Sequence, residues 1–185
     1  MDKVYNLQIN EKNYKYGLIT FSNIENFLVN YKLNKSIEDI IKEHKSYYNL
    51  KKILIYCINQ KHNNRETILF ILFNISNNEV CHIERLVYSN KSNSYYLDFI
   101  HTKKIYQKQG MGYFGLHYLI YHTKKKFKYY ELKVIKENLH AVNLYTKHKF
   151  KIIKEIKQES KDKIINILYM VKKNLLKLIF FNYYF

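Results

Sequence analysis

The stretch YYLDFIHTKKIYQKQGMGYFGLHYLIYHTKKK, residues 95–126, decides the fold. Its first part, 95–102, has the composition and turn boundary of a β-strand, and apolar residues recur at helical spacing after residue 112. Between them lie Gly110 and Gly112. Glycine lets a backbone adopt positive φ and approach a ligand closely, and N–H groups that begin a helix can bind phosphate oxygens. The segment 107–112, QKQGMG, therefore predicts a pyrophosphate cradle.

This segment differs from two common phosphate-binding loops. It lacks the GK[ST] of a Walker loop, and it lacks the third glycine of a dinucleotide fingerprint at the required place. Two glycines one residue apart also occur in tight turns that bind no ligand. Both interpretations, a phosphate cradle and a plain strand-to-helix turn, stay open on these residues alone.

Outside this stretch, apolar periodicity predicts alternating strands and helices, with no internal repeat and no Gly/Ser/Pro linker. Ser22 and Ser36 are candidate N-caps of two short helices at 24–31 and 37–44. This order is typical of α/β or α+β architecture. A further helix is expected at 138–148, and strands are expected at 4–9, 14–21, 52–59, 66–74, 79–88, 95–102, 129–135, 150–157 and 163–171.

A second informative segment is NLHAVNLYTKHKF, residues 138–150. Together the two segments resemble the GNAT (Gcn5-related) N-acetyltransferase superfamily. QKQGMG is similar to the family's (Q/R)xxGx(G/A) signature, and NLHAVNLYTKHKF is similar to its NxxAxxLYxxxGF pattern. The residues in register are Leu97, Ile100 and Thr102 for the family's LxxLxV strand, and then Asn138, Ala141, Leu144, Tyr145 and Phe150.

The detailed resemblance covers residues 95–171, and residues 1–94 agree only in the order of elements. It implies an α+β fold with α/β/α layers, in which a mixed, mostly antiparallel sheet is flanked by helices. It also implies one acetyltransferase domain at 1–173, followed by an apolar tail at 174–185. Lys149 departs from the pattern, because the family has a left-handed glycine there, a conformation that costs another residue roughly 1–2 kcal/mol.

By the same resemblance, the cofactor is acetyl-CoA. Backbone amides of the cradle hold its pyrophosphate, and the end of the preceding strand binds its pantetheine arm like an added strand. Lys108 either adds charge near the phosphates or is solvated, and Asn138 caps its helix, contacts the pantetheine arm, or does both. The implied cofactor-binding residues are Ile100, His101, Thr102, Gln107, Lys108, Gln109, Gly110, Met111, Gly112, Asn138 and Tyr145.

Acetyl transfer from a thioester to an amine needs a neutral amine, a stabilised oxyanion and a stabilised leaving thiolate. Tyr145 matches the tyrosine that faces the cofactor sulfur in the family. A phenol with a pKa of about 10 is protonated at neutral pH and can donate that proton. In a chain with 20 tyrosines, the alternative is a core tyrosine at helical spacing.

The general base is less well defined. One subgroup of protein N-terminal acetyltransferases uses a tyrosine on the strand before the cradle and a histidine on the next strand. Tyr96 matches that tyrosine, whereas Lys133 occupies the histidine position and is normally protonated. Asp98 and Glu131 lie two residues from these positions on the same strand faces, so each is a candidate base, an amine ligand or an ordinary strand residue. We predict Tyr145, Tyr96 and Asp98 as the catalytic set.

The subgroup match makes a protein N-terminal α-amine the expected acceptor, acetylated by direct attack in a ternary complex. The alternatives are a small amine and, because of Lys133 and Lys149, a non-catalytic acetyl-CoA-binding module. The tail NLLKLIFFNYYF is too short to span a bilayer. Its apolar residues and neighbouring lysines would suit a membrane interface, and the alternative is a final segment that packs on the sheet or is poorly ordered.

Composition sets outer limits. The chain has 185 residues, which fits one domain, and a formal charge of +17, which suits nucleic acid, an anionic membrane or an anionic cofactor. The lysines are scattered, so nucleic acid is not the expected partner. Cys57 and Cys81 lack zinc-site spacing, and we expect buried, reduced thiols. We see no signal peptide and expect a cytoplasmic or nuclear protein.

Overall fold

The computed structural model describes residues 3–20, 24–43, 67–89, 92–124, 129–160 and 163–173. Some sequence predictions fall outside these residues, namely the strand at 52–59 with Cys57, the cap at Ser22 and the tail at 174–185. Within the described ranges, no helix has both the length and the apolar character that crossing a membrane requires.

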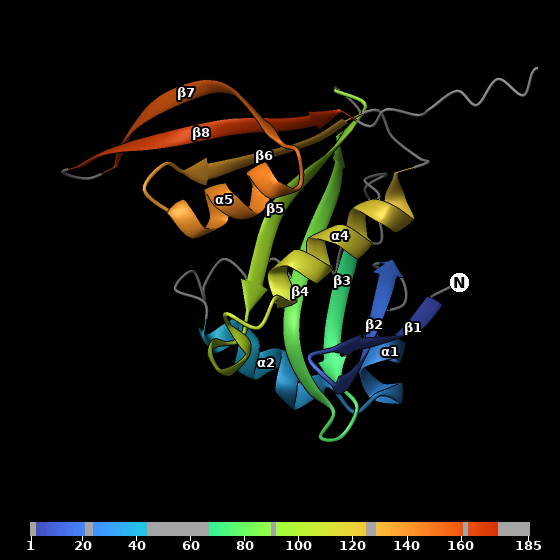
Figure 1. The fold of residues 1–185 in the computed structure, drawn as a ribbon. Helices are drawn as coiled ribbons and strands as arrows, with labels where there is room; N and C mark the ends of the chain where they lie inside the picture. Colours follow the sequence, from blue (N-terminus) through green and yellow to red (C-terminus); the bar gives the residue numbers. More distant parts are fainter. Residues whose placement is uncertain are drawn as a thin grey trace, which may run out of the picture.

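In the described part of the chain, one eight-stranded sheet has the order β1-β2-β3-β4-β5-β6-β8-β7 (Figure 1). Neighbouring strands are antiparallel except β5 and β6, which are parallel. This mixed, mostly antiparallel sheet confirms the predicted fold class. The strands are β1 (Lys3–Ile9), β2 (Lys12–Thr20), β3 (Thr67–Asn74), β4 (Glu79–Ser89), β5 (Ser94–Thr102), β6 (Tyr129–Ile135), β7 (Lys151–Ser160) and β8 (Lys163–Lys173).

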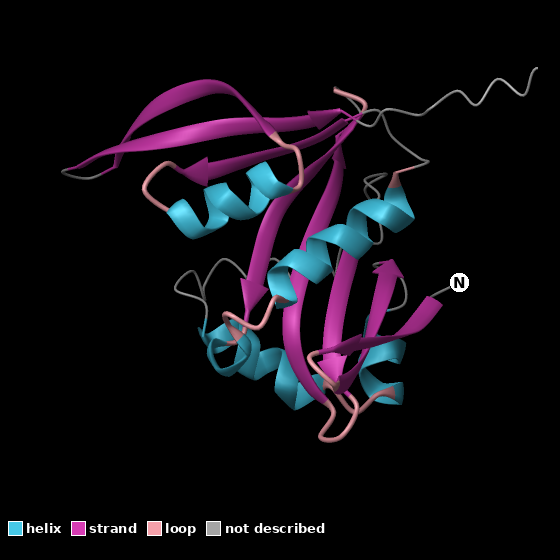
Figure 2. Cartoon of the chain, viewed as in Figure 1, coloured by secondary structure: helices cyan, strands magenta, loops and turns pink. Residues whose placement is uncertain are grey.

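Helices cover both faces of the sheet (Figure 2). On one face α4 lies across β3, β4 and β5, and α5 lies beside β6 and β8 (Figure 1). On the other face α1 contacts β2, and α2 contacts β4. The helices are α1 (Ile24–Asn30), α2 (Asn34–Glu43), α4 (Met111–Thr123) and α5 (Leu139–Lys147), with a short 3₁₀ helix η2 (Lys104–Tyr106) before α4.

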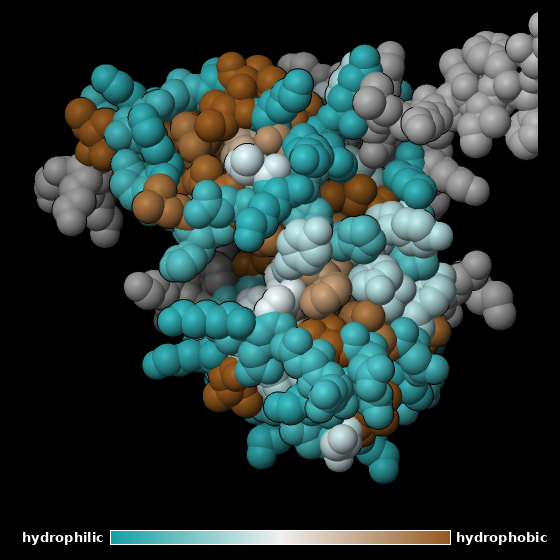
Figure 3. All heavy atoms as spheres, in the orientation of Figure 1, coloured by the Kyte–Doolittle hydropathy of each residue, from teal (hydrophilic) through white to brown (hydrophobic). Residues whose placement is uncertain are grey.

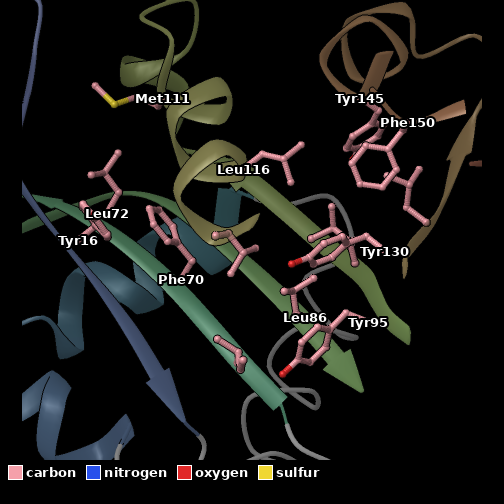
Figure 4. Close-up of a cluster of buried hydrophobic side chains, with 14 of the residues drawn as sticks. Tyr16, Phe70, Leu72, Leu86, Tyr95, Met111, Leu116, Tyr130, Tyr145 and Phe150 are labelled. Atoms are coloured by element: carbon pink, nitrogen blue, oxygen red, sulfur yellow. The ribbon is translucent and has the colours of Figure 1, made fainter. Parts of the chain in front are cut away.

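Each face of the sheet has its own apolar core. Phe70 and Tyr130 belong to the core under α4 and α5, which Figure 4 shows. Leu69 and Ile71, the neighbours of Phe70 in β3, belong to the core under α1 and α2, together with Ile40. Successive side chains of a strand point to opposite faces, so a fully buried strand such as β3 reads as a continuous apolar run.

One predicted helix cap is wrong. α2 begins at Asn34, two residues before Ser36, so Ser36 lies inside the first turn of the helix. Its Oγ accepts a hydrogen bond from the N–H of Val80 at 2.7 Å. The hydroxyl thus joins α2 to β4, and this tertiary contact overrides the local preference of serine for the N-cap.

The end of α5 has the hydrogen bonds of a Schellman motif. Lys149 adopts a left-handed conformation, with φ 67°. Its N–H bonds to the carbonyl of Thr146 at 2.9 Å, and the N–H of Phe150 bonds to the carbonyl of Tyr145 at 3.0 Å. The Tyr145 and Phe150 rings meet edge to face with centroids 5.8 Å apart (Figure 4). A lysine therefore completes the turn that positions Tyr145.

Cys81 is a buried free thiol, as predicted. It is 0% exposed, and burial raises its pKa to about 12. The thiol therefore stays protonated at neutral pH and packs as part of the apolar core.

Candidate active site

β5 and β6 are paired over only part of their length. The pairing covers Ser94 to Leu97 of β5, whereas β5 continues to Thr102 and β6 continues to Ile135. Figure 1 shows the two strands fanning apart beyond this point. The end of β5 therefore presents backbone groups that β6 does not use, which is where an extended ligand can add like a strand.

A β-bulge in β5 lies where the strands separate. Leu86 of β4 pairs with Leu97, while Arg85 pairs with Phe99, so Asp98 is the extra residue. Leu97 packs in the core under α4, and Phe99 packs in the core under α2, so the alternation of faces breaks at the bulge. A bulge bends its strand and increases the local twist, which accounts for the divergence of β5 from β6.

A cavity of about 600 Å³ lies between the end of β5, the start of α4 and α5. This volume is typical of a ligand pocket. Figure 3 shows a hollow on this side of the molecule. Of the predicted cofactor residues, Gln109 and Tyr145 do not line the cavity, and those that do are Ile100, His101, Thr102, Gln107, Lys108, Gly110, Met111, Gly112 and Asn138.

The first turn of α4 brings backbone N–H groups to this cavity. Gly110 is the N-cap residue, has φ 85° and provides no side-chain cap. The N–H groups of Met111 and Gly112 lie in the first turn, where no carbonyl one turn earlier can accept from them. Both residues line the cavity. Uncapped amides at the positive end of a helix dipole suit an anion such as a diphosphate.

Two glutamine side chains brace the loop that leads into α4. Nε2 of Gln107 donates to the carbonyl oxygen of Thr102 at 3.1 Å, which ties the loop to the end of β5. Nε2 of Gln109 donates to the carbonyl oxygen of Ile105 at 2.8 Å, within the loop itself. Gln109 therefore has a local structural partner, which explains why its side chain supports the cradle from outside the cavity.

Positive side chains flank the cavity. Lys108, from the loop before α4, and Lys147, from the last turn of α5, both line it, as does His140. Lys108 adopts a positive φ of 61°, and it is exposed. Cations on two walls of one cavity attract an anionic ligand. Lys147 and His140 were not among the residues predicted from the sequence, because only the fold brings α5 beside the cradle.

α5 supplies the two remaining predicted residues. Asn138 is its N-cap, since Oδ1 accepts from the N–H of Ala141 at 3.2 Å, and it also lines the cavity. Tyr145 belongs to α5 and is 9% exposed, because its ring lies on the buried side of that helix (Figure 4). Burial raises the pKa of Tyr145 well above its usual value, and nearby Glu84 and Tyr96 raise it further. Its phenol is therefore protonated at neutral pH, as a proton donor must be; its catalytic role stays a prediction.

The other predicted catalytic residues lie where β5 and β6 separate. Tyr96 pairs in register with Glu131 of β6. Burial raises the pKa of Tyr96, and the charges of Asp98 and Glu131 add to that effect. Asp98 forms an ion pair with Arg85, whose Nε donates to Oδ1 at 2.7 Å. The side chain of Asp98 is thus engaged by a cation that sequence analysis did not identify.

Glu131 also has a fixed partner. Its Oε2 accepts a hydrogen bond from the hydroxyl of Tyr169 in β8 at 2.7 Å. Burial and this carboxylate raise the pKa of Tyr169 to about 12. Lys133, at the histidine position of the subgroup, is exposed and pairs in register with Tyr169. Carboxylates and phenols are therefore among the polar groups beside the separating strands.

β4 carries a buried polar pair that was not predicted from the sequence. His82 and Glu84 are both 0% exposed and joined by a hydrogen bond of 2.7 Å between Nε2 and Oε1. Their i, i+2 spacing puts both side chains on one strand face, and polar residues on a buried face were the available signal. The sequence alone did not show which face of β4 is buried. His82 and Glu84 were therefore not distinguished from ordinary strand residues.

No protein-family model matches the chain, and no curated protein sequence matches it either. Solved structures do match it. The ribosomal-protein-S18-alanine N-acetyltransferase of Escherichia coli has a TM-score of 0.61 at 16% identity, with 100% of both chains covered. An acetyltransferase of the GNAT family from Streptococcus pneumoniae has a TM-score of 0.58 at 18% identity, covering 94% of this chain and 99% of that one.

The spermidine N-acetyltransferase of Vibrio cholerae, in complex with CoA and spermine, has a TM-score of 0.58 at 14% identity. The match covers 94% of this chain and 95% of that one. At sequence identities this low, the structural matches establish a shared fold. They do not identify the acceptor, which depends on the particular residues of the site. With its parallel β5–β6 pair opening beside the start of α4, this chain adopts the GNAT N-acetyltransferase fold.

Proposed function

We propose that this chain is an acetyl-CoA-dependent N-acetyltransferase whose preferred acceptor is a protein N-terminal α-amine. The observation that carries the proposal is the open β5–β6 pair beside the uncapped start of α4. One side offers an extended backbone edge, and the other offers amides for a diphosphate.

The chemistry of the residues that line the cavity suits the successive parts of coenzyme A. Met111 and Gly112 offer backbone N–H groups to the diphosphate, and Lys108 and Lys147 offer positive charge. The end of β5 offers a backbone edge that β6 does not pair with to the amides of the pantetheine arm. Bound acetyl-CoA would supply an activated acetyl thioester.

The chain's own groups then serve the transfer. Backbone N–H groups of β5 beyond Asp98 can donate to the thioester oxygen, where negative charge develops. The protonated phenol of Tyr145 can donate to the departing sulfur. Tyr145 is held by the turn at Lys149 and by its contact with Phe150, so its position is fixed before the substrates bind.

The carboxylates beside the separating strands suit a cationic amine. Glu131 and Asp98 can bind the ammonium form and lower the cost of bringing it to the thioester. Because Arg85 neutralises much of the Asp98 charge, Glu131 is the carboxylate better placed to accept a proton. Tyr96 stays protonated and can orient the amine or a water molecule.

An N-terminal amine fits the charge of the chain better than a polyamine does. A formal charge of +17 repels a ligand with several positive charges more strongly than a peptide terminus with one. Among the matching folds, the ribosomal-protein-S18-alanine N-acetyltransferase is named for such an acceptor, and the spermidine N-acetyltransferase is named for the alternative. The alternatives for this chain are therefore a small-molecule amine and a non-catalytic acetyl-CoA-binding module.

The test is a free-CoA release assay with acetyl-CoA and a panel of peptides that have free N-termini. The same peptides with acetylated N-termini are the matched controls, and spermidine and an amino sugar represent small amines. We expect turnover only with free N-termini. Turnover with spermidine alone would refute the acceptor class, and no release with any amine would refute the enzymatic proposal.

The contribution of the candidate acid and base is tested with three conservative variants. Tyr145→Phe should keep cofactor affinity and lose rate by about 10²-fold or more, because only the donated proton is missing. Glu131→Gln should lose more rate than Asp98→Asn if Glu131 accepts the proton. Equal turnover of Tyr145→Phe and the wild type would remove Tyr145 from the mechanism.

A further inference from the structure

A buried hydrogen-bonded chain runs from β4 to the wall of the cavity. Nε2 of His82 lies 2.7 Å from Oε1 of Glu84, and Nδ1 of His82 lies 2.7 Å from Oγ1 of Thr102. Both residues of the pair are 0% exposed, whereas Thr102 lines the cavity. The proposed acetyl transfer uses neither His82 nor Glu84, so the pair needs an explanation of its own.

α4 is built to leave room for this pair. A Cβ on Gly115 would lie 2.5 Å from Nε2 of His82 and 2.8 Å from Oε1 of Glu84. Both distances are shorter than a Cβ atom can approach, so a side chain at this position would displace the pair. Oε2 of Glu84 finds no hydrogen-bond partner among the described residues. A charged carboxylate with a bare, buried oxygen is costly, so the site favours the pair without net charge.

We propose that the Glu84–His82 pair directs the hydroxyl hydrogen of Thr102 into the cavity, where Thr102 donates a hydrogen bond to an acceptor oxygen of coenzyme A. The inference rests on the proposed acetyl-CoA site. It assigns Thr102 as a cofactor-binding residue through its side chain, and it assigns His82 and Glu84 as positioning residues.

The number of protons on the pair fixes the direction in which the hydroxyl hydrogen of Thr102 points. Without net charge, the pair holds two, one on Nδ1 of His82 and one shared between Nε2 and Oε1 of Glu84. Nδ1–H then donates to Oγ1 of Thr102, which leaves the hydroxyl hydrogen of Thr102 for the cavity. This result is the same whether the shared proton lies on nitrogen or on oxygen.

Loss of the shared proton reverses the direction. The remaining proton stays on Nε2, next to the buried Glu84 carboxylate, and Nδ1 becomes an acceptor. The hydroxyl of Thr102 then donates to Nδ1 and presents lone pairs to the cavity, where they repel an acceptor oxygen. Because burial raises the pKa of Glu84, this reversal requires an alkaline shift in pH.

The groups around the Glu84–His82 pair keep their protonation state while the pair loses its shared proton. Tyr145 is the titratable group that faces the pair from α5, and its raised pKa keeps it protonated. The described groups that face the pair from neighbouring elements are the Phe70 ring of β3, Thr102 of β5, the backbone of α4 at Gly115 and the phenol of Tyr145.

The test is calorimetric titration of the full chain with coenzyme A at a series of pH values from mildly acidic to alkaline. Wild-type affinity should fall as the pH rises through the raised pKa of Glu84. Glu84→Gln cannot become charged, and its amide can donate to Nε2 of His82, so this fall should be absent. The coenzyme's own phosphate titrates near pH 6. This titration affects the wild type and the variants alike, so it cancels in the ratio of their coenzyme A affinities at each pH. Glu155→Gln is the matched control, because that exposed carboxylate binds Lys136 far from the pair in sequence.

Variants of Thr102 test the hydrogen bond itself. Thr102→Val keeps the shape and removes the hydroxyl, so it should weaken coenzyme A binding about fivefold at the acidic end and flatten the pH profile. Thr102→Ser should keep both affinity and profile. These variants also carry the test if Glu84→Gln does not fold, as circular dichroism would show.

Identical affinities and profiles for the wild type and Thr102→Val would overturn the inference, as would a wild-type profile in folded Glu84→Gln. Absence of coenzyme A binding in the wild type would instead refute the proposed cofactor site. The two failures are therefore distinguishable in one set of titrations.

Discussion

Replacing Lys149 by glycine should stabilise the protein. Lys149 has φ 67°, and its N–H completes the Schellman turn after α5. A side chain in this left-handed conformation costs roughly 1–2 kcal/mol. Glycine removes that cost, but the greater freedom of glycine in the unfolded chain offsets about 0.5–1 kcal/mol. The expected net gain in the free energy of unfolding is about 0.5–1 kcal/mol.

The control for this prediction is Lys149→Ala. Burial and the charge of Lys149 lower the pKa of Lys172. Both variants remove the charge of Lys149 and so change Lys172 in the same way. Only glycine also removes the backbone cost, so the difference between the two variants reports that cost less the offset from the freedom of glycine in the unfolded chain. Thermal unfolding followed by circular dichroism should place the glycine variant about 1–4 °C above the alanine variant. Equal midpoints, or a lower midpoint for glycine, would refute the strain argument.

Three further variants test the packing and electrostatics around the site. Gly115→Ala should lower the free energy of unfolding by about 1–3 kcal/mol in urea titrations, because the new methyl overlaps His82; an unchanged midpoint would contradict the buried pair. Tyr145→Phe should leave the affinity for acetyl-CoA unchanged in calorimetry, and a large loss of affinity would mean that the phenol binds the cofactor. His148 has its pKa lowered from 6.5 to about 4, chiefly by burial, so the folded state binds fewer protons and stability should fall as the pH drops through this range. His148→Gln should lose that pH dependence while its amide still reaches the carbonyl of Tyr113, and an unchanged dependence in urea titrations would rule out His148 as its source.

The sequence was most informative where local chemistry decides local structure. The two glycines of 107–112 required a special backbone before α4, and Gly110 has φ 85°. Asn138 was correctly identified as a cap, since an N-cap depends on residues within one turn. Ser36 failed the same reasoning because Val80, 44 residues away, competes for its hydroxyl.

Features that depend on cross-strand register could not be predicted. The bulge at Asp98 exists because of how β5 pairs with β4, and no single-strand pattern fixes that pairing. The ion pair of Asp98 with Arg85 follows from the same register. The Glu84–His82 pair depends on which face α4 covers, which the sequence leaves open.

The central claim, that amides at the start of α4 hold the cofactor's diphosphate beside the open end of β5, is tested most directly by hydrogen–deuterium exchange with and without acetyl-CoA. We predict slower exchange with acetyl-CoA at Met111 and Gly112, and along β5 from Ile100 to Thr102. Unchanged exchange at these amides, at cofactor concentrations that saturate any binding seen by calorimetry, would contradict the claim.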